Sequence, residues 1–456
     1  MMTREADVWP HTSRPMPWVL AGFLAMVWLV PFDSMSLPVS LPMDARMDRP
    51  VLMGIAALWF LSLVGASTVT RLRVSRVHLA LLLFLVIAAG SLVLNGATIV
   101  RLGDMDQATK KLALLFSYAL LFVIVASSLK RREVHNFVVF MVALACILSI
   151  GSLIEYRLGY NAFFNWSEKF LPVVRPPELG AVDSIGRKSV VGPTIHPLAV
   201  AMMMALALPF ALSMFLHAVE RRPRLLYAAA AGLMFAAALA TQRKTSLVAP
   251  AFGLVVLMAY RPNALKRLVP VGIGLFLAIH VIAPGAIGGV GDQLKPQNLF
   301  GVMSTKDRQS DYGAIKPDVV KHPLLGRGYE SYDQRKYRIL DNQYLTTVIG
   351  TGALGILAYL AFFGSILSLA HRVYRGRDPG MAPLAIGASA AIASLVVGSG
   401  LLDVLALPQL PYLICFIGGL VVVLAQAEAP SAAPAPETAP RATAQVARLR
   451  PRFITD

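Results

Sequence analysis

The chain has 456 residues, of which 56% are hydrophobic and only 15% charged, with a formal net charge of +17. Soluble domains carry about 25% charged residues, so this composition excludes an ordinary soluble protein and predicts an integral membrane protein. The two cysteines, Cys146 and Cys415, both lie in apolar stretches, which argues against a disulfide framework or a cysteine zinc site.

About 20 consecutive apolar residues cross the hydrocarbon core of a bilayer, and the chain offers about a dozen such stretches. The predicted fold class is all-α integral membrane, with about 12 transmembrane helices. A polar N-terminus (1–15) is followed by helices 1–9 within 16–288, a large outer loop at 289–341 and helices 10–12 within 342–427. No convincing small-residue cleavage site follows the N-terminus, so we expect the first helix to be retained. The tail 428–456 is rich in Ala and Pro and cannot bury a core, so we expect it to be disordered. The expected helices are 16–33, 50–68, 79–98, 111–129, 137–156, 194–217, 225–241, 246–260, 268–288, 342–370, 380–399 and 402–425.

The short loops between the predicted helices carry most of the basic residues. Cytoplasmic loops of membrane proteins are enriched in Lys and Arg, and every cluster follows an even-numbered helix if the N-terminus is cytoplasmic. We therefore expect both termini to be cytoplasmic. No nucleic-acid-binding motif accompanies these residues, so no nucleic-acid partner is expected. The clusters are Arg71, Arg73 and Arg76; Lys130, Arg131 and Arg132; Arg221, Arg222 and Arg224; Arg261, Lys266 and Arg267; and Arg372, Arg375 and Arg377.

This orientation places four informative segments outside: about 157–193, the tight turn Gln242–Thr245, the loop 289–341 and a short stretch near 400–403. The turn carries Arg243 and Lys244 on the side where positive charge is disfavoured. These cations either reach toward the lipid headgroups or bind an anionic partner such as a phosphate.

The loop 289–341 has about fifty residues, and connections of this length are usually functional or disordered. Its tyrosines and leucines, among them Tyr312 and Leu324, give it a core to fold around. The segment His322–Tyr329 predicts a turn, because proline fixes one dihedral angle and glycine allows positive ones. Interleaved acids and bases along the loop are also typical of a solvated surface. Asp341 precedes a long apolar stretch, where its carboxylate serves either as a helix cap or as a general base.

Several sequence elements between about residues 185 and 360 follow one another in a specific order. They are Gly192-Pro193-x-x-His196-Pro197, Gln242-Arg243, Arg308 followed by Tyr312, His322-Pro323-Leu324-Leu325-Gly326-Arg327-Gly328, Asp341-Asn342-Gln343-Tyr344-Leu345, and Gly352-x-x-Gly355. Together they resemble the signature of the O-antigen ligase and polysaccharide polymerase (Wzy-type) superfamily of membrane glycosyltransferases.

The resemblance implies a GT-C-like fold and glycosyl transfer on the outer face of the bacterial plasma (inner) membrane, in lipopolysaccharide or exopolysaccharide biosynthesis. The implied partners are an undecaprenyl-diphosphate-linked oligosaccharide, a glycan or lipid acceptor, the lipid bilayer and polysaccharide-assembly membrane proteins. It implies no metal and no other cofactor. By the same match Arg243 and Arg308 bind the diphosphate, and Asp341 is the base at the acceptor hydroxyl. The expected substrate-binding residues are Lys244, Arg187, His196, His322, Arg327 and Asn342.

Alternatives stay open at this point. Ligases of this superfamily place His where this chain has Asp341, and the departure favours a polymerase. His196 and His322 each adjoin a proline, so turn structure explains them as well as catalysis does. A transporter or flippase for a lipid or anionic solute is the second hypothesis, but such proteins usually hold ionisable residues within helices near the bilayer midplane. The predicted helix interiors of this chain are nearly free of charge.

Overall fold

Helices account for nearly all the regular structure in the described part of the chain, where an isolated antiparallel bridge between Met35 and Val173 is the exception. An α-helix satisfies its backbone N–H and C=O groups internally, which is why apolar stretches adopt it in lipid. The computed structural model describes residues 7–35, 46–65, 70–176, 179–180, 190–263, 266, 272, 302–334, 336–376 and 378–426, with 302–309 described by their backbone alone.

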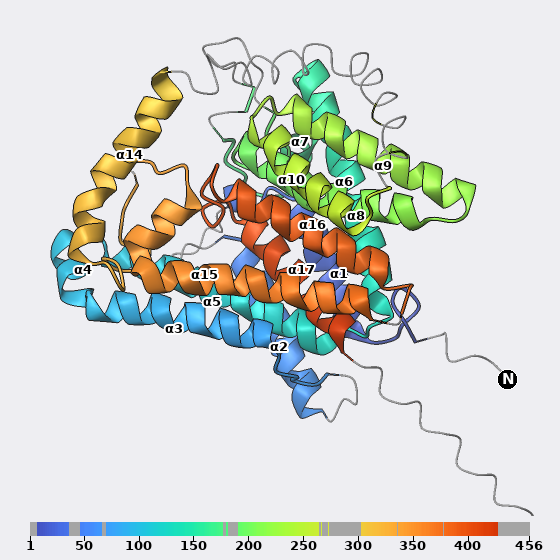
Figure 1. Cartoon of the computed structure of the whole chain (residues 1–456), viewed down its shortest axis with the longest axis horizontal. Coiled ribbons are helices and arrows are strands. Elements are labelled where there is room, and N and C mark those ends of the chain that lie inside the picture. The colour runs from blue at the N-terminus through green and yellow to red at the C-terminus, as the bar shows by residue number, and fades with distance from the viewer. Residues whose placement is uncertain are drawn as a thin grey trace, which may run out of the picture. The chain divides into compact units, whose positions relative to one another are not determined.

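The observed helices follow the apolar stretches of the sequence (Figure 1). They are α1 (Pro15–Leu29), the short 3-10 helix η1 (Phe32–Ser34), α2 (Asp48–Val64), α3 (Arg76–Leu94), α4 (Gly96–Leu102), α5 (Met105–Ser128), α6 (Glu133–Leu158), α7 (Ala162–Ser167), α8 (Pro197–His217), α9 (Arg221–Ala240), α10 (Thr245–Tyr260), α14 (Val302–Lys321), α15 (Gln343–Arg375), α16 (Ala382–Gly398) and α17 (Gln409–Ala425). Eleven of the twelve predicted helices coincide with these, and the remaining one, 268–288, lies outside the described residues except for Gly272. Among the described residues, six helices are long and apolar enough to cross a membrane: α3, α5, α6, α8, α9 and α15.

Helix α8 forms the centre of one group of helices, packed against α9, α10 and α16. Its residues 199–211 are all buried. Small residues let the neighbouring helices approach closely, because a Cβ on Gly387 of α16 would lie 2.7 Å from the Phe210 ring of α8. A second group is built from α15 packed on α3 and α16, and α17 packed on α5. Figure 1 shows α15 running alongside α3, with α14 near the start of α15.

Contacts between helix ends fall into two consistent sets. Segments predicted to be cytoplasmic meet one another, as Arg14 and the backbone N–H of Lys130 both bind the buried Glu133, and Arg131 pairs with Asp378. Segments predicted to be outside likewise meet one another. These contacts join Asn95 to Gly326, Lys336 to Asp104, Gln409 to Asp33 and Gly192 to Glu155. We refer to the end of the helices that carries the second set as the loop end.

The predicted outer loop differs most from its expectation. Residues 302–321, expected as part of a loop with turns, form the helix α14, although it contains Pro317 and its composition is polar. Packing explains the helix, because Ile315 is buried in a small cluster with Leu340 and Ile349. Two residues expected in the loop core are instead exposed, Tyr312 by 56% and Leu324 by 63%.

Candidate functional site

Helix α15 is interrupted at Gly352, whose φ of 65° and ψ of −162° are not helical. The break frees backbone groups between residues 349 and 354 of the helix, and the loop segment 323–328 binds them. Arg327 N donates to Ile349 O (2.9 Å), Gly328 N to Gly350 O (3.1 Å), Ala353 N to Pro323 O (2.9 Å) and Leu354 N to Leu324 O (3.1 Å). The two glycine-containing motifs of the sequence therefore form one backbone-bonded unit.

Glycine is required on both sides of this contact. A Cβ on Gly352 would lie 2.3 Å from the carbonyl carbon of Leu324, and one on Gly326 would lie 2.5 Å from the carbonyl carbon of Gly350. Both glycines also have a positive φ, a backbone conformation that other residues rarely adopt. The close approach of loop and helix thus depends on residue types that the sequence motifs contain.

Helix α3 holds this unit from the side. The hydroxyl of Ser91 lies within hydrogen-bond distance of two carbonyls, Leu325 O and Gly350 O, so one side chain links the loop to the broken helix. Four residues further along, Asn95 Nδ2 donates to Gly326 O at 3.1 Å. Polar side chains in the last turn of an otherwise apolar helix therefore position the loop.

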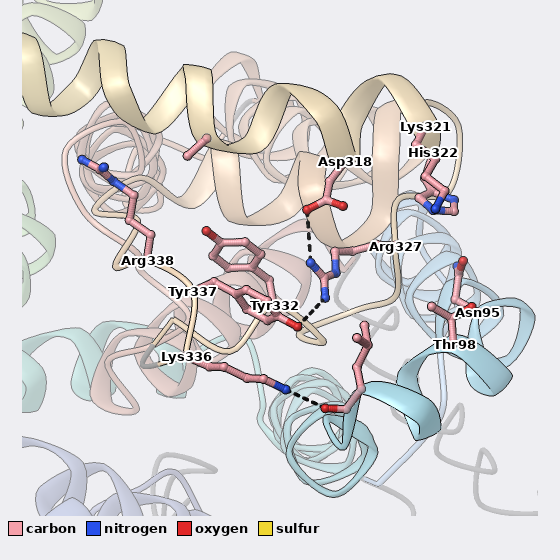
Figure 2. Close-up of a pocket in the computed structure, with 12 residues that line it drawn as sticks. Asn95, Thr98, Asp318, Lys321, His322, Arg327, Tyr332, Lys336, Tyr337 and Arg338 are labelled. Carbon is pink, nitrogen blue, oxygen red and sulfur yellow. Dashed lines mark hydrogen bonds and ion pairs between the residues drawn. The ribbon is translucent and has the colours of Figure 1, made fainter.

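A cavity of about 750 Å³ opens beside this loop, and we call it the loop cavity (Figure 2). Its volume is that of a pocket for a small-molecule ligand. It is lined by Asn95, Thr98, Leu102, Ala314, Asp318, Lys321, His322, Arg327, Tyr332, Lys336, Tyr337 and Arg338. Two of the predicted substrate-binding residues, His322 and Arg327, are among them.

Arg327 is the centre of the polar network in the loop cavity. Its guanidinium group donates to Asp318 Oδ2 (3.1 Å) and to the hydroxyl of Tyr337 (3.2 Å), as Figure 2 shows, and lies 3.8 Å from Asp104 Oδ2. Lys336 Nζ donates to Asp104 Oδ1 at 3.1 Å, and this hydrogen bond raises the pKa of Lys336. The short connection between α4 and α5 is in this way joined to the outer loop, 232 residues further along the chain.

A buried acid lies next to the start of α15. Asp403, between α16 and α17, is 8% exposed, and its Oδ2 accepts hydrogen bonds from Gln334 Nε2 (2.7 Å) and Thr346 Oγ1 (3.3 Å). Burial, reinforced by the nearby carboxylate of Glu330, raises the pKa of Asp403 to about 7. Glu330 itself has a φ of +52°, a strained backbone for a residue with a side chain. An acid poised to exchange protons near neutral pH, beside a strained residue, is typical of a functional site.

The structure separates the roles of Asp341 and Asn342, the pair that precedes α15. Asn342 is the cap, since its Oδ1 accepts from the N–H of Tyr344 (2.9 Å) and of Leu345 (3.4 Å). Capping was one of two alternatives for Asp341, and that alternative is wrong. The Asp341 side chain is exposed and makes no hydrogen bond or ion pair with any described residue, and its role as a base stays a prediction.

Arg243 and Lys244 lie in the turn between α9 and α10, and both are half-buried. The turn is fixed locally, because Arg243 O accepts from the N–H (3.0 Å) and the hydroxyl (2.6 Å) of Ser246. Just before it, Gln242 has a φ of +50° and its Nε2 donates to the Tyr156 hydroxyl (3.1 Å) at the end of α6. Neither Arg243 nor Lys244 lines the loop cavity.

His196 caps helix α8, with its Nδ1 accepting from the N–H of Leu198 at 3.2 Å. The backbone just before it is held by Glu155 of α6, whose carboxylate accepts from Val191 N (3.1 Å) and Gly192 N (2.9 Å). This arrangement agrees with the turn-structure interpretation of His196.

The remaining two predicted site residues are not placed in detail. Arg308 lies in the first half of α14, but its side chain is outside the described residues, and Arg187 lies outside them altogether. The pairing of Arg243 with Arg308 at one site stays a prediction.

Sequence reasoning missed Asp403, although a signal was present. It is the only charged residue between Asp378 and Glu428, and it lies in one of the four segments predicted to be outside. An isolated acid between two apolar helices is costly unless it has a role or a partner. Asp104 was missed as well, and no local pattern pairs it with Lys336.

Within the described residues, no group of three or more His, Cys, Asp or Glu side chains is arranged to hold a metal ion. The chain matches no protein-family model and no curated protein.

Proposed function

We propose that the chain is a multi-pass glycosyltransferase of the bacterial inner membrane, with about 12 transmembrane helices, a GT-C-like fold and both termini in the cytoplasm. It moves or polymerises an undecaprenyl-diphosphate-linked glycan on the outer face, toward which the loop end is directed. One observation carries the proposal: the segments His322–Gly328 and Gly350–Leu354 are hydrogen-bonded to each other. Two of the motifs that resemble the superfamily signature thus meet as one unit rather than lying scattered.

The proposed reaction is an inverting displacement at the anomeric carbon of the donor sugar. The acceptor hydroxyl oxygen forms the new C–O bond, the bond from that carbon to the diphosphate breaks, and the electron pair stays on the diphosphate. Arg243 and Arg308 stabilise this leaving anion, and one such preorganised donor contributes about 10²–10³ in rate. Asp341 accepts the proton of the hydroxyl, a contribution of about 10²–10⁴.

Three single variants test this assignment in a strain that lacks the chromosomal gene. Arg243→Ala, Arg308→Ala and Asp341→Asn are each expected to abolish the glycan product while the protein stays folded in the membrane. Arg175→Ala is the matched control, because it removes an exposed cation paired with Glu168 that lies in another predicted outer segment. Normal glycan output from both Arg243→Ala and Arg308→Ala rejects the diphosphate role.

The glycan profile of the deletion strain distinguishes the two types of transferase. A polymerase defect leaves single repeats attached to the acceptor and removes the long chains. A ligase defect instead leaves long chains on the undecaprenyl carrier. Asp341, in place of the His of ligases, leads us to expect the first pattern.

A transporter or flippase is the second candidate, and the break in α15 favours it, because broken helices frequently form transport sites. The break at Gly352, however, is filled by the loop 323–328, which binds its freed backbone groups. Charged residues of the six long apolar helices lie in their first or last two turns. Movement of a lipid or anionic solute in reconstituted vesicles, without glycan transfer, would reverse the ranking of the two candidates.

A further inference from the structure

The loop cavity is richer in cations than in acids. Its lining contains four permanent cations and one acid, Asp318, a formal charge of +3. Two acids that do not line the cavity form ion pairs with lining cations: Asp104 binds Lys336, and Asp311 binds Arg338. When both are counted, one positive charge remains without a compensating carboxylate.

That surplus is located at one end of the cavity. Within the described residues, the side chains of Lys321 and His322 form no hydrogen bond or ion pair, whereas the other three cations are paired with acids. Figure 2 shows Lys321 and His322 together at this end, with Asn95 and Thr98 across from them. Both N–H groups of Asn95 are already bound, to Ser91 O and Gly326 O, so this end of the cavity presents an ammonium, an imidazole and the hydroxyl of Thr98, which suit a carboxylate or phosphate group.

The middle of the cavity has a different chemistry. Tyr332 and Tyr337 stack with ring centroids 5.0 Å apart and an interplanar angle of 28°, and Tyr337 is 39% exposed. Its hydroxyl accepts from Arg327 and donates to Asp104 at 3.1 Å, so the ring is held in a fixed position. Arg327 and Lys336 also lie over this ring, 4.7 Å and 5.5 Å from its centroid. The part of the fixed ring that stays exposed, bordered by these polar groups, matches the apolar C–H face and hydroxylated edge of a sugar.

From these two features we infer that the loop cavity binds an anionic saccharide. The saccharide ring packs at Tyr337, and its carboxylate or phosphate group lies between Lys321 and His322. Binding itself is independent of the proposed transferase activity; that the bound saccharide is the acceptor glycan rests on the proposed function. The substrate class of the enzyme would then be an acidic repeat rather than a neutral one.

Isothermal titration with the full chain in lipid nanodiscs tests the inference without any lipid-linked donor. Four probes are compared: tri-galacturonate, its methyl ester, glucose 6-phosphate and inorganic phosphate. We expect one of the two anionic saccharides to bind at least about tenfold more tightly than the neutral ester, with an affinity that falls as salt rises. Whichever of the two binds identifies the anion as a carboxylate or a phosphate.

Variants then locate the site. Lys321→Gln and His322→Gln are each expected to weaken the anionic saccharide about tenfold, and Tyr337→Ala to weaken the saccharides but not inorganic phosphate. Lys169→Gln is the matched control, because Lys169 is an exposed lysine of another predicted outer segment and does not line the cavity. Circular dichroism of each variant shows whether it retains its helices.

Three results overturn the inference: neither anionic saccharide binds better than the ester, Lys321→Gln and His322→Gln both retain wild-type affinity, or inorganic phosphate binds as tightly as the saccharides. The proposed function fails separately. If an anionic saccharide binds but the Arg243→Ala and Arg308→Ala variants keep normal glycan output, saccharide binding by the cavity is supported and the transferase proposal is rejected. If those two variants lose the glycan and no anionic saccharide binds, only the inference about the cavity falls.

Discussion

Substituting Gly352 by alanine is the most direct test of the unit formed by the loop 323–328 and the broken helix α15. The added Cβ would lie 2.3 Å and 2.4 Å from the carbonyl carbon and oxygen of Leu324, and 2.6 Å from the nitrogen of Leu325. All three are backbone atoms, so no side chain can rotate away to make room. The backbone of Gly352 also has a φ of 65°, outside the usual range of alanine.

The magnitude follows from these contacts. A sparsely populated backbone conformation costs about 1–3 kcal/mol. Relieving the clash means separating the loop from the helix, which breaks the hydrogen bonds from Ala353 N and Leu354 N, each contributing about 1 kcal/mol. We therefore expect Gly352→Ala to destabilise the folded protein by about 3–5 kcal/mol.

Thermal unfolding in detergent, followed by cysteine accessibility or intrinsic fluorescence, measures this loss. Hydrogen exchange at residues 323–328 should rise at the same time, because the loop loses its partners. Gly364→Ala in the same helix is the control: no atom lies within 4 Å of its added Cβ, and alanine favours a helix over glycine by about 1 kcal/mol. Equal stability and exchange in Gly352→Ala and the wild type would refute the reasoning.

Three further predictions concern side chains around the loop end. Because the folded-state pKa of Asp403 is raised from 3.8 to about 7, its contribution to stability is complete below about pH 4 and is lost, by up to about 4 kcal/mol, as the pH rises through about 7. The melting temperature of Asp403→Asn should therefore rise relative to wild type between about pH 5 and pH 8, and a pH-independent difference would contradict the burial of this acid. Ser91→Ala removes the hydroxyl that links Leu325 O to Gly350 O, although Gly350 O keeps its hydrogen bond from Gly328 N, and should cost about 1–3 kcal/mol in unfolding experiments, whereas Ser117→Ala, whose hydroxyl bonds only within its own helix, should cost less. Asp104→Asn replaces the carboxylate that raises the pKa of Lys336 by a neutral amide, so acylation of that amine, followed by mass spectrometry, should become faster, and an unchanged rate would show that the pair is absent in solution.

The helices were predictable because one physical constraint dominates them. An apolar stretch of sufficient length in lipid has to satisfy its backbone internally, and eleven predicted helices are observed on that basis. Segments that the basic clusters assign to the same side are in contact with one another, as the hydrogen bonds of Glu133 at one end and Asp104 at the other show. The turn predicted at His322–Tyr329 agrees with the positive φ of Gly326, whereas the break of α15 at Gly352 and the binding of the two motifs to each other were not predicted.

The parts that failed depend on contacts between distant residues. Helix α14 has a polar sequence with an internal proline, and it is stabilised by the packing of Ile315 on residues of α15 and the loop. Asn342 rather than Asp341 caps α15, because a shift of one position decides which side chain reaches the free N–H groups. Asp104 and Lys336 are 232 residues apart, and nothing in either local sequence pairs them.

A transferase has to bring two substrates together, and the loop end is organised in a way that supports such an arrangement. Helix α16 packs on both α10 and α15, so its outer end lies between the turn that carries Arg243 and the start of α15 that carries Asp341. The approach is close on both sides, since a Cβ on Gly398 would lie 3.9 Å from Ala249 of α10, and one on Gly400 would lie 3.6 Å from the ring of Tyr344. In the proposed reaction, a donor diphosphate at the turn and an acceptor saccharide in the loop cavity are therefore held by different helices. A transporter needs one site reached alternately from two sides, and it gains nothing from cationic groups divided between separate elements at the same end.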